Sequence, residues 1–385
     1  MTERGKENGM DFDEIIDRSA TASLKWERYR GRDILPLWVA DMDFRSPPAV
    51  MDALRKRVAH GVFGYTLPPA ELTDAVVAHV NEDFRWQIEP EWIVWLPGLV
   101  TGLNAACRAV GDNGDDVLTL TPVYPPFLTA PGLSGRNALT VPLVDDGNRW
   151  APDMENIEKA VSPGTRLLLL CNPHNPVGRA YEERELARLA EMCAQRNMII
   201  CSDEIHAGLV LDPGRRHIPI AALSRETALR TITLLAPSKT YNLPGLGCGF
   251  AIIPSPGLRQ RFLNVIEGIV PHVNALGYTA ALAAYRDSGK WYGEMIGYLR
   301  ENLALVEESI GRMPGLSMRH VEATYLAWID CGNLNGGDPA AFFERAGVGL
   351  SDGRRFGGEG FVRLNFGCPR SILQMALERM ERAVK

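Results

Sequence analysis

Three polar segments of the sequence contain residue types that could do chemistry, and each directly follows a short apolar run. Asn175 lies between two Asn-Pro steps, Asp203 is followed by a second acid, and Lys239 lies in an Ala-Pro-Ser-Lys-Thr segment. Proline restrains the backbone on both sides, so its loop presents the Asn175 amide as a donor. A carboxylate at the end of a buried strand needs a cation or a donor. A lysine beside a buried sheet edge can have its pKa lowered and attack a carbonyl carbon.

Each of these residues also has a plainer interpretation that the residues alone leave open. The Asn-Pro loop around Asn175 is also typical of a tight connection between a strand and a helix. Asp203 is equally consistent with one half of a buried ion pair. A lysine such as Lys239 is most often a solvated surface residue.

The elements that must position these residues alternate along the chain from about residue 48 to 290. Apolar runs of four to eight residues, separated by helical patterns, predict a mostly parallel sheet that is buried on both faces. The expected strands are 92–96, 117–120, 137–144, 166–171, 198–202, 231–235 and 249–253, and the expected helices are 48–60, 71–84, 101–110 and 182–196.

Beyond about residue 290 the strands are fewer and farther apart, which predicts a second, smaller α+β unit. The expected elements are helices 291–313, 339–346 and 371–384 and strands 325–330 and 361–366. Ligands of parallel α/β sheets bind outside the carboxyl ends of the strands. We therefore expect Asn175, Asp203 and Lys239 to meet at one edge of the sheet, in a cleft between the two units.

The composition restricts the class of protein but does not indicate an activity. A chain of 385 residues with 46% hydrophobic residues and a net charge of −6 is typical of a two- to three-domain globular protein, and argues against disorder and generic nucleic-acid binding. The apolar runs are too short to cross a membrane, and residues 1–13 are too polar for a secretory signal. The seven scattered cysteines indicate reduced thiols in a cytoplasm. The seven histidines have no metal-ligand spacing, so we expect no metal.

An amine, a carboxylate and an amide donor at one sheet edge meet the needs of pyridoxal 5'-phosphate, which forms a Schiff base, binds an acid at its pyridine nitrogen and accepts a hydrogen bond at its ring hydroxyl. With these residues in this order, the chain resembles the fold-type I pyridoxal-phosphate enzymes of the class I/II aminotransferase superfamily. Within that superfamily it resembles the cystathionine β-lyase branch typified by MalY and PatB. The segments that carry the resemblance are 23–26, 35–44, 63–66, 122–127, 172–178, 203–206, 236–240 and 363–370.

The resemblance implies roles for four residues around the cofactor ring. Lys239 forms the Schiff base and then takes the Cα proton of the substrate as general base. Asp203 keeps the pyridine nitrogen protonated, and Asn175 donates to the ring hydroxyl oxygen. Tyr124 stacks on the ring and shields it, although an aromatic residue beside prolines is also typical of a core.

Further residues are implied at the cofactor phosphate. Gly98, Leu99 and Val100 stand where a strand turns into a helix, and Ser238 adds a hydroxyl. Tyr65 reaches the phosphate of the neighbouring subunit, so that each site needs two chains, and it or Lys239 protonates the leaving sulfur.

Three other positions complete the implied site. His206 faces the cofactor, with a structural histidine as the alternative. Arg363 binds the substrate α-carboxylate, with a structural salt bridge as the alternative. Asn175 also contacts the substrate, and the segment around Ala40 and the loop 351–358 line its pocket.

The chain departs from the aminotransferase pattern in two places. Gly247 stands eight residues after the lysine, where many aminotransferases carry an arginine for the phosphate, and Ala236 stands where a serine is common. Both departures favour the lyase branch.

The resemblance implies a C–S β-lyase that acts on cystathionine or related cysteine S-conjugates and releases thiol, pyruvate and ammonia. Two alternatives stay open: an aminotransferase of the same fold that acts on an L-amino acid, and a MalY-like regulatory protein that acts by binding a partner. The expected architecture is a large cofactor-binding domain at 46–288 and a small domain built from 1–45 and 289–385. We expect a homodimer with shared active sites.

Overall fold

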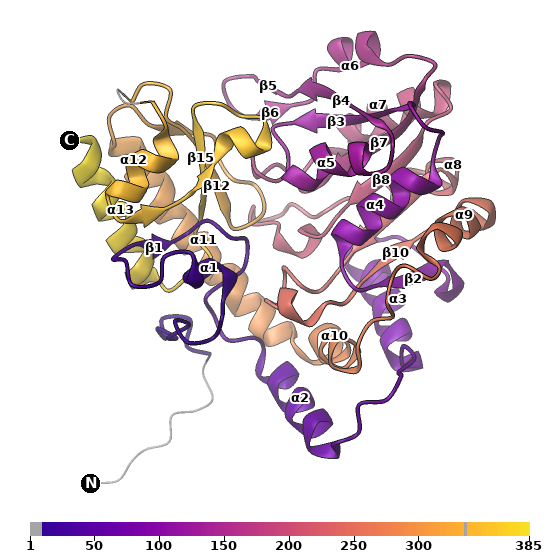
Figure 1. The fold of residues 1–385 in the computed structure, drawn as a ribbon, viewed down its shortest axis with the longest axis horizontal. Coiled ribbons are helices and arrows are strands. Elements are labelled where there is room, and N and C mark those ends of the chain that lie inside the picture. The colour runs from indigo at the N-terminus through magenta and orange to yellow at the C-terminus, as the bar shows by residue number, and fades with distance from the viewer. Residues whose placement is uncertain (1–9, 335–336) are drawn as a thin grey trace.

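A seven-stranded sheet forms the centre of the computed structural model, which describes residues 10–334 and 337–385. Its strands run in the order β2-β10-β9-β8-β7-β3-β4 (Figure 1). Only β10 is antiparallel to its neighbours, and the other strands of this sheet are parallel to one another. The strand bounds are β2 Ile93–Leu96, β3 Asp116–Thr121, β4 Asn137–Pro142, β7 Thr165–Cys171, β8 Ile199–Asp203, β9 Thr231–Leu235 and β10 Gly249–Ile252. The predicted α/β class with a mostly parallel sheet is confirmed.

Helices cover both faces of this sheet, and the leucines of β7 show why its sequence is apolar throughout. Leu167 and Leu169 pack into the core beneath α4 (Leu99–Ala109) and α9 (Pro256–Ile266). Leu168 and Leu170 point to the opposite face, into the core beneath α6 (Met154–Ala160) and α7 (Glu183–Gln195). Because successive side chains of a strand alternate between faces, a strand buried on both must be continuously hydrophobic.

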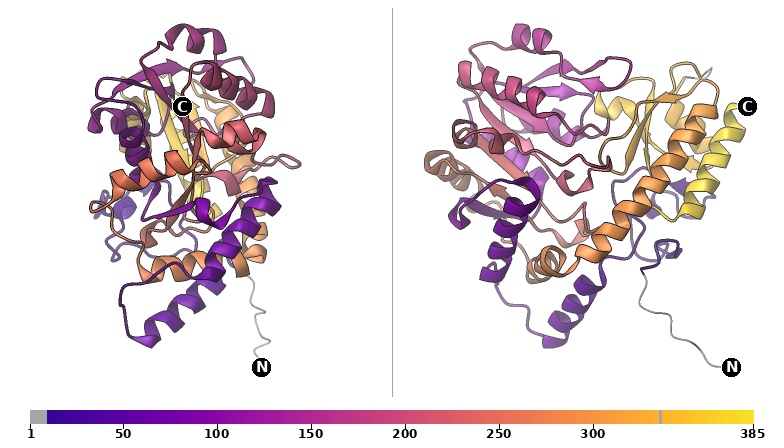
Figure 2. Two further views of the ribbon diagram at one scale, coloured as in Figure 1. Left: turned by 90° about the vertical axis from the view of Figure 1, so that its right-hand side faces the viewer. Right: turned by 180° about the vertical axis from the view of Figure 1, so that it is seen from behind.

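A smaller antiparallel sheet lies to one side, in the order β11-β12-β15-β14. Its strands are β11 Ser317–Met318, β12 Leu326–Asp330, β14 Ser351–Asp352 and β15 Phe361–Asn365. The long helix α11 (Gly289–Arg312) and the terminal helix α13 (Arg370–Val384) run alongside each other against it, as the view from behind shows (Figure 2).

The N-terminal segment returns to this smaller sheet. Strand β1 (Leu35–Pro36) pairs in parallel with β13 (Val348–Gly349), and α1 (Leu24–Glu27) lies close to β1 (Figure 1). The residues between them contact two helices of the smaller unit, since Arg32 pairs with Glu344 of α12 (Pro339–Arg345) and Asp33 with Arg379 of α13. The first nine residues of the small domain that the sequence predicts lie outside the described residues.

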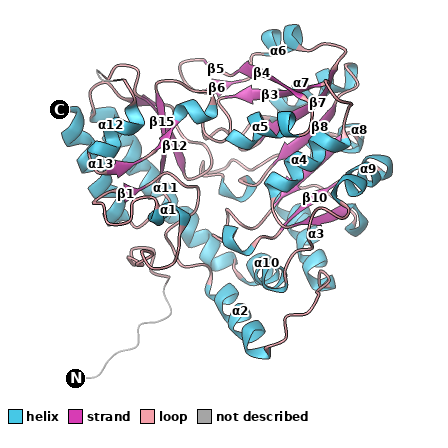
Figure 3. Cartoon of the chain, viewed as in Figure 1, coloured by secondary structure: helices cyan, strands magenta, loops and turns pink. Residues whose placement is uncertain are grey.

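The structure contains helices that the sequence patterns did not predict (Figure 3). Helix α10 (Ala275–Asp287) is rich in alanine and has little polar contrast between its faces, so its hydrophobic period is weak. Helix α5 (Pro125–Leu133) opens on two prolines, which suit the first helical turn. The remaining unpredicted α-helices are α6, α9, the short α8 (Arg225–Leu229) and the four-residue α1.

Most predicted boundaries differ from the observed ones by one or two residues. Helix α4 begins at Leu99, two residues before the predicted 101–110 helix. The predicted strand 137–144 divides into β4 and the separate β5 (Val144–Asp145), which pairs with β6 (Trp150–Ala151).

The connection between α2 (Pro48–His60) and α3 (Ala70–Phe84) stands away from the body of the molecule (Figures 1 and 2). It exposes Phe63, Leu67 and Tyr65, and the Tyr65 side chain is fully exposed. Among the described residues, no helix is both long and apolar enough to cross a bilayer.

Candidate active site

The carboxyl ends of three neighbouring strands form the floor of one cavity. Cys171 at the end of β7 pairs with Asp203 at the end of β8, and Asp203 in turn pairs with Leu234 of β9. This register brings the loops that follow the strands together around a cavity of about 460 Å³. Of the residues predicted from sequence, Asn175, Asp203, Lys239, Tyr124, His206, Ser238, Gly98, Leu99, Val100, Ala40 and Arg363 all line it.

The sequence left open whether the acid at the end of β8 belongs to a buried polar pair or is available to a ligand. The structure contains one acid of each kind, Glu204 and Asp203. Glu204 is fully buried and accepts hydrogen bonds from His217 at 2.7 Å and Ser202 at 2.8 Å, so it is the structural member. Asp203 is also buried, but it has no ion pair among the described residues and accepts only the backbone N–H of Ile205 at 3.1 Å. Burial raises the pKa of Asp203 to about 7, and Lys239 opposes that rise. The Asp203 carboxylate is therefore available to a cationic ligand group.

Lys239 is half-buried, and its side chain lines the cavity instead of extending into solvent. Its Nζ donates to the carbonyl oxygen of Ala40. Burial lowers the pKa of Lys239 to about 8, with Asp41 opposing the change. A fraction of the amine is therefore unprotonated near neutral pH, as a nucleophile or a general base requires.

Arg363 is a buried cation, and no carboxylate in the described part of the chain pairs with it. It lies in β15, and its guanidinium donates to Asn175 Oδ1 at 2.9 Å and to the Trp38 carbonyl at 2.8 Å, but to no carboxylate. Its Nε atom is buried without a hydrogen-bond partner, and burial lowers its pKa to about 10. By contrast, the equally buried Arg179 pairs with two glutamates. An uncompensated buried charge is costly, so Arg363 is suited to receive a ligand carboxylate.

Two aromatic residues border the same space. Tyr124 precedes α5, and its backbone N–H donates to the carbonyl of Asn175 at 3.0 Å, which fixes the two loops to each other. His206 is buried, and its Nδ1 has no hydrogen-bond partner. Burial and the charges of Lys239 and Arg363 hold the pKa of His206 well below its ordinary value, so its ring is neutral.

The N-terminus of α4, at Gly98 and Leu99, forms another wall of the cavity, and the first backbone N–H groups of a helix have no partner within that helix. Gly247 adopts a left-handed φ of +57°. A Cβ atom there would lie 3.0 Å from the carbonyl oxygen of Pro97. The backbone therefore favours glycine at residue 247, which leaves backbone donors and Ser238 to bind an anion at this wall.

Tyr65 is the one predicted site residue that does not line the cavity. Its loop stands away from the body of its own chain, with the side chain in solvent.

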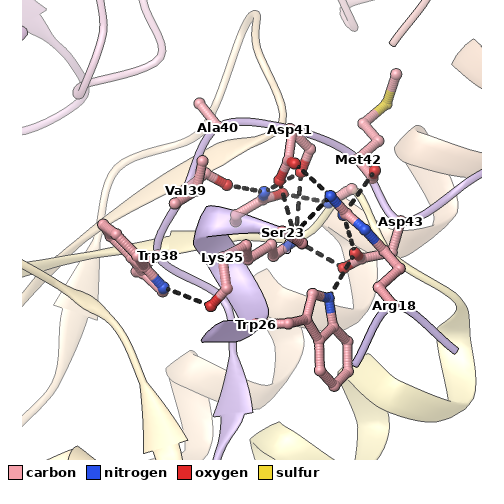
Figure 4. A network of polar contacts seen from close by, with 12 residues as sticks. Arg18, Ser23, Lys25, Trp26, Trp38, Val39, Ala40, Asp41, Met42 and Asp43 are labelled. Atoms are coloured by element: carbon pink, nitrogen blue, oxygen red, sulfur yellow. Dashed lines mark hydrogen bonds and ion pairs between the residues drawn. The ribbon is translucent and has the colours of Figure 1, made fainter. Parts of the chain in front are cut away.

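A buried network of charges holds the segment 38–43 against the cavity (Figure 4). Lys25 is completely buried and contacts Asp43 at 2.6 Å, while Arg18 contacts Asp41 at 2.8 Å and also reaches Asp43. Because this segment supplies the Ala40 carbonyl, the network fixes the hydrogen-bond partner of the Lys239 amine.

Two asparagines hold the same segment from the opposite side. Asn242, three residues after Lys239, bonds to the backbone of Met42 and Phe44, and Asn365 donates to the carbonyl groups of Val39 and Asp41. Our reasoning from sequence did not single out Lys25, Arg18 or these asparagines. The residues that they contact lie far away in the sequence, so no local pattern indicates them.

We expect Lys25→Met to lower the free energy of unfolding by about 3 kcal/mol, because it leaves the Asp43 carboxylate buried with only part of its compensation. Thermal and urea unfolding would measure the loss. Lys290→Met is the control, since Lys290 is exposed and its pair with Glu294, 3.9 Å apart, should contribute less than about 1 kcal/mol. Equal losses in the two variants would contradict a structural role for the network.

Comparison with known proteins agrees with this geometry. The family model of class I and II aminotransferases matches residues 32–380. The chain therefore belongs to the class I and II aminotransferase family, and its fold is that of the fold-type I pyridoxal-phosphate enzymes.

Within that family, the chain is similar to cystathionine β-lyase PatB of Bacillus subtilis, with 38% identity over 97% of this chain and 100% of the relative. The solved structure of OvoB has a TM-score of 0.96 and 47% identity, covering 97% of this chain and 99% of that one. Cystalysin from Treponema denticola, solved with pyridoxal 5'-phosphate, has a TM-score of 0.93 and 33% identity, covering 97% and 98%. The predicted relation to the cystathionine β-lyase branch is confirmed.

Proposed function

We propose that this protein is a pyridoxal-phosphate-dependent C–S β-lyase that acts on cystathionine or a related cysteine S-conjugate. The observation that carries the proposal is a single cavity bordered by Lys239, Asp203 and Arg363, none of which has an ion-pair partner among the described residues. These groups are complementary to an aldehyde, a pyridinium nitrogen and an α-carboxylate, respectively. The relation to PatB supports the lyase reaction, and cystalysin supports the cofactor.

The residues around the cavity fit the cofactor. Lys239 would hold it through Nζ, Asp203 would pair with its pyridine nitrogen, and Asn175 would contact its ring hydroxyl. The N-terminus of α4 and Ser238 would bind its phosphate. When bound, pyridoxal phosphate withdraws electrons from the Cα atom of an attached amino acid.

The chain's own groups would then carry out the proton transfers. Arg363 holds the substrate α-carboxylate, and Asn175, bonded to the Arg363 guanidinium, keeps that guanidinium in place. Lys239 Nζ takes the Cα proton, the Cβ–S bond breaks with its electron pair on sulfur, and the thiolate accepts a proton from Lys239 or Tyr65. Addition of one water then gives one thiol, one pyruvate and one ammonium per substrate.

The test is to incubate the holoenzyme with cystathionine in the absence of any keto acid. We expect equal amounts of pyruvate and free thiol. Strict dependence on an added keto acid, with no thiol released, would contradict the lyase and favour the aminotransferase alternative. A MalY-like regulatory role would appear instead as partner binding that survives Lys239→Ala.

We further propose a homodimer in which each active site includes Tyr65 of the partner subunit. The support is that Tyr65 is fully exposed beside exposed Phe63 and Leu67, on a loop that stands away from the body of its own chain, and that it does not line the cavity of that chain. A fully exposed apolar loop of this kind is typical of a contact surface.

This arrangement predicts complementation between two inactive variants. Lys239→Ala and Tyr65→Ala dimers should each have little activity, but chains mixed in equal amounts and allowed to exchange should recover about a quarter of wild-type activity, because half of the dimers contain one intact site. Pyruvate release measures the recovery. Absence of recovery in mixtures that contain hybrid dimers would contradict the shared site.

The domain division at 46–288, with 1–45 and 289–385 as the small domain, also stays a proposal. It is supported by the pairing of β1 with β13 and by the common core that joins Leu37, Leu303 and Leu373. We propose a cytoplasmic location, which suits the seven buried, free cysteines.

A further inference from the structure

A second cavity of about 400 Å³ adjoins the first. Both cavities are lined by Trp38, Ser351 and Arg355, which therefore form the boundary between them. The outer wall of the second cavity, which we call the distal cavity, comes from α12 and from Arg28 and Arg32 near the N-terminus. Neither the proposed cofactor contacts nor the binding of the α-carboxylate makes use of this space.

The acids of the distal cavity are already compensated by arginines. Glu344 accepts from Arg32 at 2.9 Å. Asp352 accepts three hydrogen bonds from the Arg354 guanidinium, at 2.7–3.0 Å, and Asp338 also pairs with Arg354. None of the three therefore needs Arg355 as a partner.

Arg355 is by contrast a cation without a partner. It is exposed, lines both cavities, and forms no ion pair or side-chain hydrogen bond with any residue in the ranges 10–334 and 337–385. Its positive charge acts on groups of both cavities. It adds to the lowering of the Asp352 pKa, which burial opposes and which comes mainly from the hydrogen bonds of Arg354, and it opposes the rise that burial causes in the pKa of Tyr124. Its guanidinium is thus free to bind an anion at the boundary between the two cavities.

The backbone that carries Arg355 is held tightly in place. The short helix Gly353–Phe356 ends on Phe356, whose carbonyl accepts the backbone N–H of Val123 at 2.8 Å, next to Tyr124. A Cβ atom on Gly353 would lie 2.3 Å from the carbonyl oxygen of Gly358, so the backbone packs closely on itself at this turn. The backbone of Arg355 is therefore held beside the loop of Tyr124, while its side chain is exposed to a ligand.

Trp38 forms the apolar part of the boundary. Its carbonyl accepts from Arg363, and its indole N–H donates to the Lys25 carbonyl at 3.1 Å (Figure 4). The Arg28 guanidinium lies 4.8 Å from the Trp38 ring centre. The indole is thereby fixed on several sides, with apolar surface available to a hydrocarbon chain.

We propose that the distal cavity binds the substituent on the substrate sulfur, which leaves as part of the thiol. Arg355 binds a carboxylate at the far end of this substituent. This inference rests on the proposed C–S lyase function and defines its substrate class: cysteine S-conjugates whose sulfur substituent ends in a carboxylate. Arg363 binds the α-carboxylate, which every substrate has. Arg355 binds the end of the sulfur substituent, which differs between substrates.

The test compares two substrates of nearly equal shape, S-(2-carboxyethyl)-L-cysteine and its neutral amide, S-(2-carbamoylethyl)-L-cysteine. With the wild-type holoenzyme, we expect kcat/KM to favour the carboxylate by about tenfold or more, the scale of a hydrogen bond to a charged group. Arg355→Gln should bring the ratio of the two kcat/KM values close to one, mainly by raising KM for the carboxylate. Arg355→Lys should retain part of the preference, because it keeps the charge but loses the planar donor fork.

Arg312→Gln is the control, since Arg312 lies on α11, lines neither cavity and should leave the ratio unchanged. A carboxylate preference that persists in Arg355→Gln, or a wild-type enzyme without any preference, would overturn the inference. Release of pyruvate from both substrates in that event would leave the lyase function intact. No pyruvate from either substrate or from cystathionine would overturn the proposed function itself.

Discussion

Lys239→Ala should abolish pyruvate release from cystathionine, with a loss of at least about 10⁴-fold in kcat. The amine both attaches the cofactor and moves the Cα proton, and general acid–base catalysis alone contributes about 10²- to 10⁴-fold. The variant should also lack the visible absorption band of lysine-bound pyridoxal phosphate. Because Lys239 donates only to the Ala40 carbonyl, the fold should survive its removal.

The control for Lys239→Ala is Lys290→Ala, which removes an exposed amine from α11 far from the cavity. It should keep both the absorption band and the activity. A Lys239→Ala protein that binds the cofactor with an unchanged spectrum, or that still releases pyruvate at near wild-type rates, would overturn the assignment of Lys239.

Asp203→Asn should have two opposite effects, lower activity and a more stable cofactor-free protein. The activity should fall by about 10²- to 10³-fold or more, the scale of losing one preorganised electrostatic contact, because an amide does not hold the pyridine nitrogen protonated. Stability should rise because burial of the Asp203 carboxylate without a cation is unfavourable in the absence of cofactor.

The pH dependence of that stabilisation follows from the raised pKa. In the unfolded chain Asp203 loses its proton near its ordinary value of 3.8, whereas in the folded chain it keeps the proton up to about pH 7. Between these values the unfolded state binds fewer protons, so the contribution of Asp203 to the free energy of unfolding falls as pH rises. The stabilisation of Asp203→Asn should therefore be small near pH 4 and reach on the order of a few kcal/mol above pH 7.

Thermal unfolding of the cofactor-free wild-type and Asp203→Asn proteins at several pH values checks this expectation. Glu204→Gln is the matched comparison, because Glu204 is buried beside Asp203 but has His217 as a partner. It should destabilise the protein instead. A pH-independent difference between Asp203→Asn and wild type would contradict the raised pKa.

The strands and the loops that follow them could be predicted because their signals are local. The four leucines of β7 indicate burial on both faces, and the polar segments that follow β7, β8 and β9 must meet once those strands are parallel neighbours. The same logic predicts Asn175, Asp203 and Lys239 on one sheet edge, and all three line the cavity there. The resemblance to a known family, not local pattern, pointed to Arg363, Tyr124 and Tyr65.

The rest depended on contacts between residues far apart in the chain. Lys25 looks like a surface lysine in the sequence, yet it is completely buried against Asp43. The division of roles between Asp203 and Glu204 depends on where His217 lies, which adjacent acids do not reveal. Arg354 and Arg355 are neighbours of the same type, and only the positions of Asp338 and Asp352 show which of them is neutralised.

Gly247 has a consequence for how enzymes of this family could diverge. Its left-handed φ disfavours a side chain, and a Cβ atom there would lie 3.0 Å from the Pro97 carbonyl oxygen, so the arginine that many aminotransferases carry there would strain this loop. An arginine at residue 247 would fit this chain only if the loop also shifted away from Pro97. The lyase and aminotransferase patterns should therefore differ in the path of this backbone as well as in one side chain.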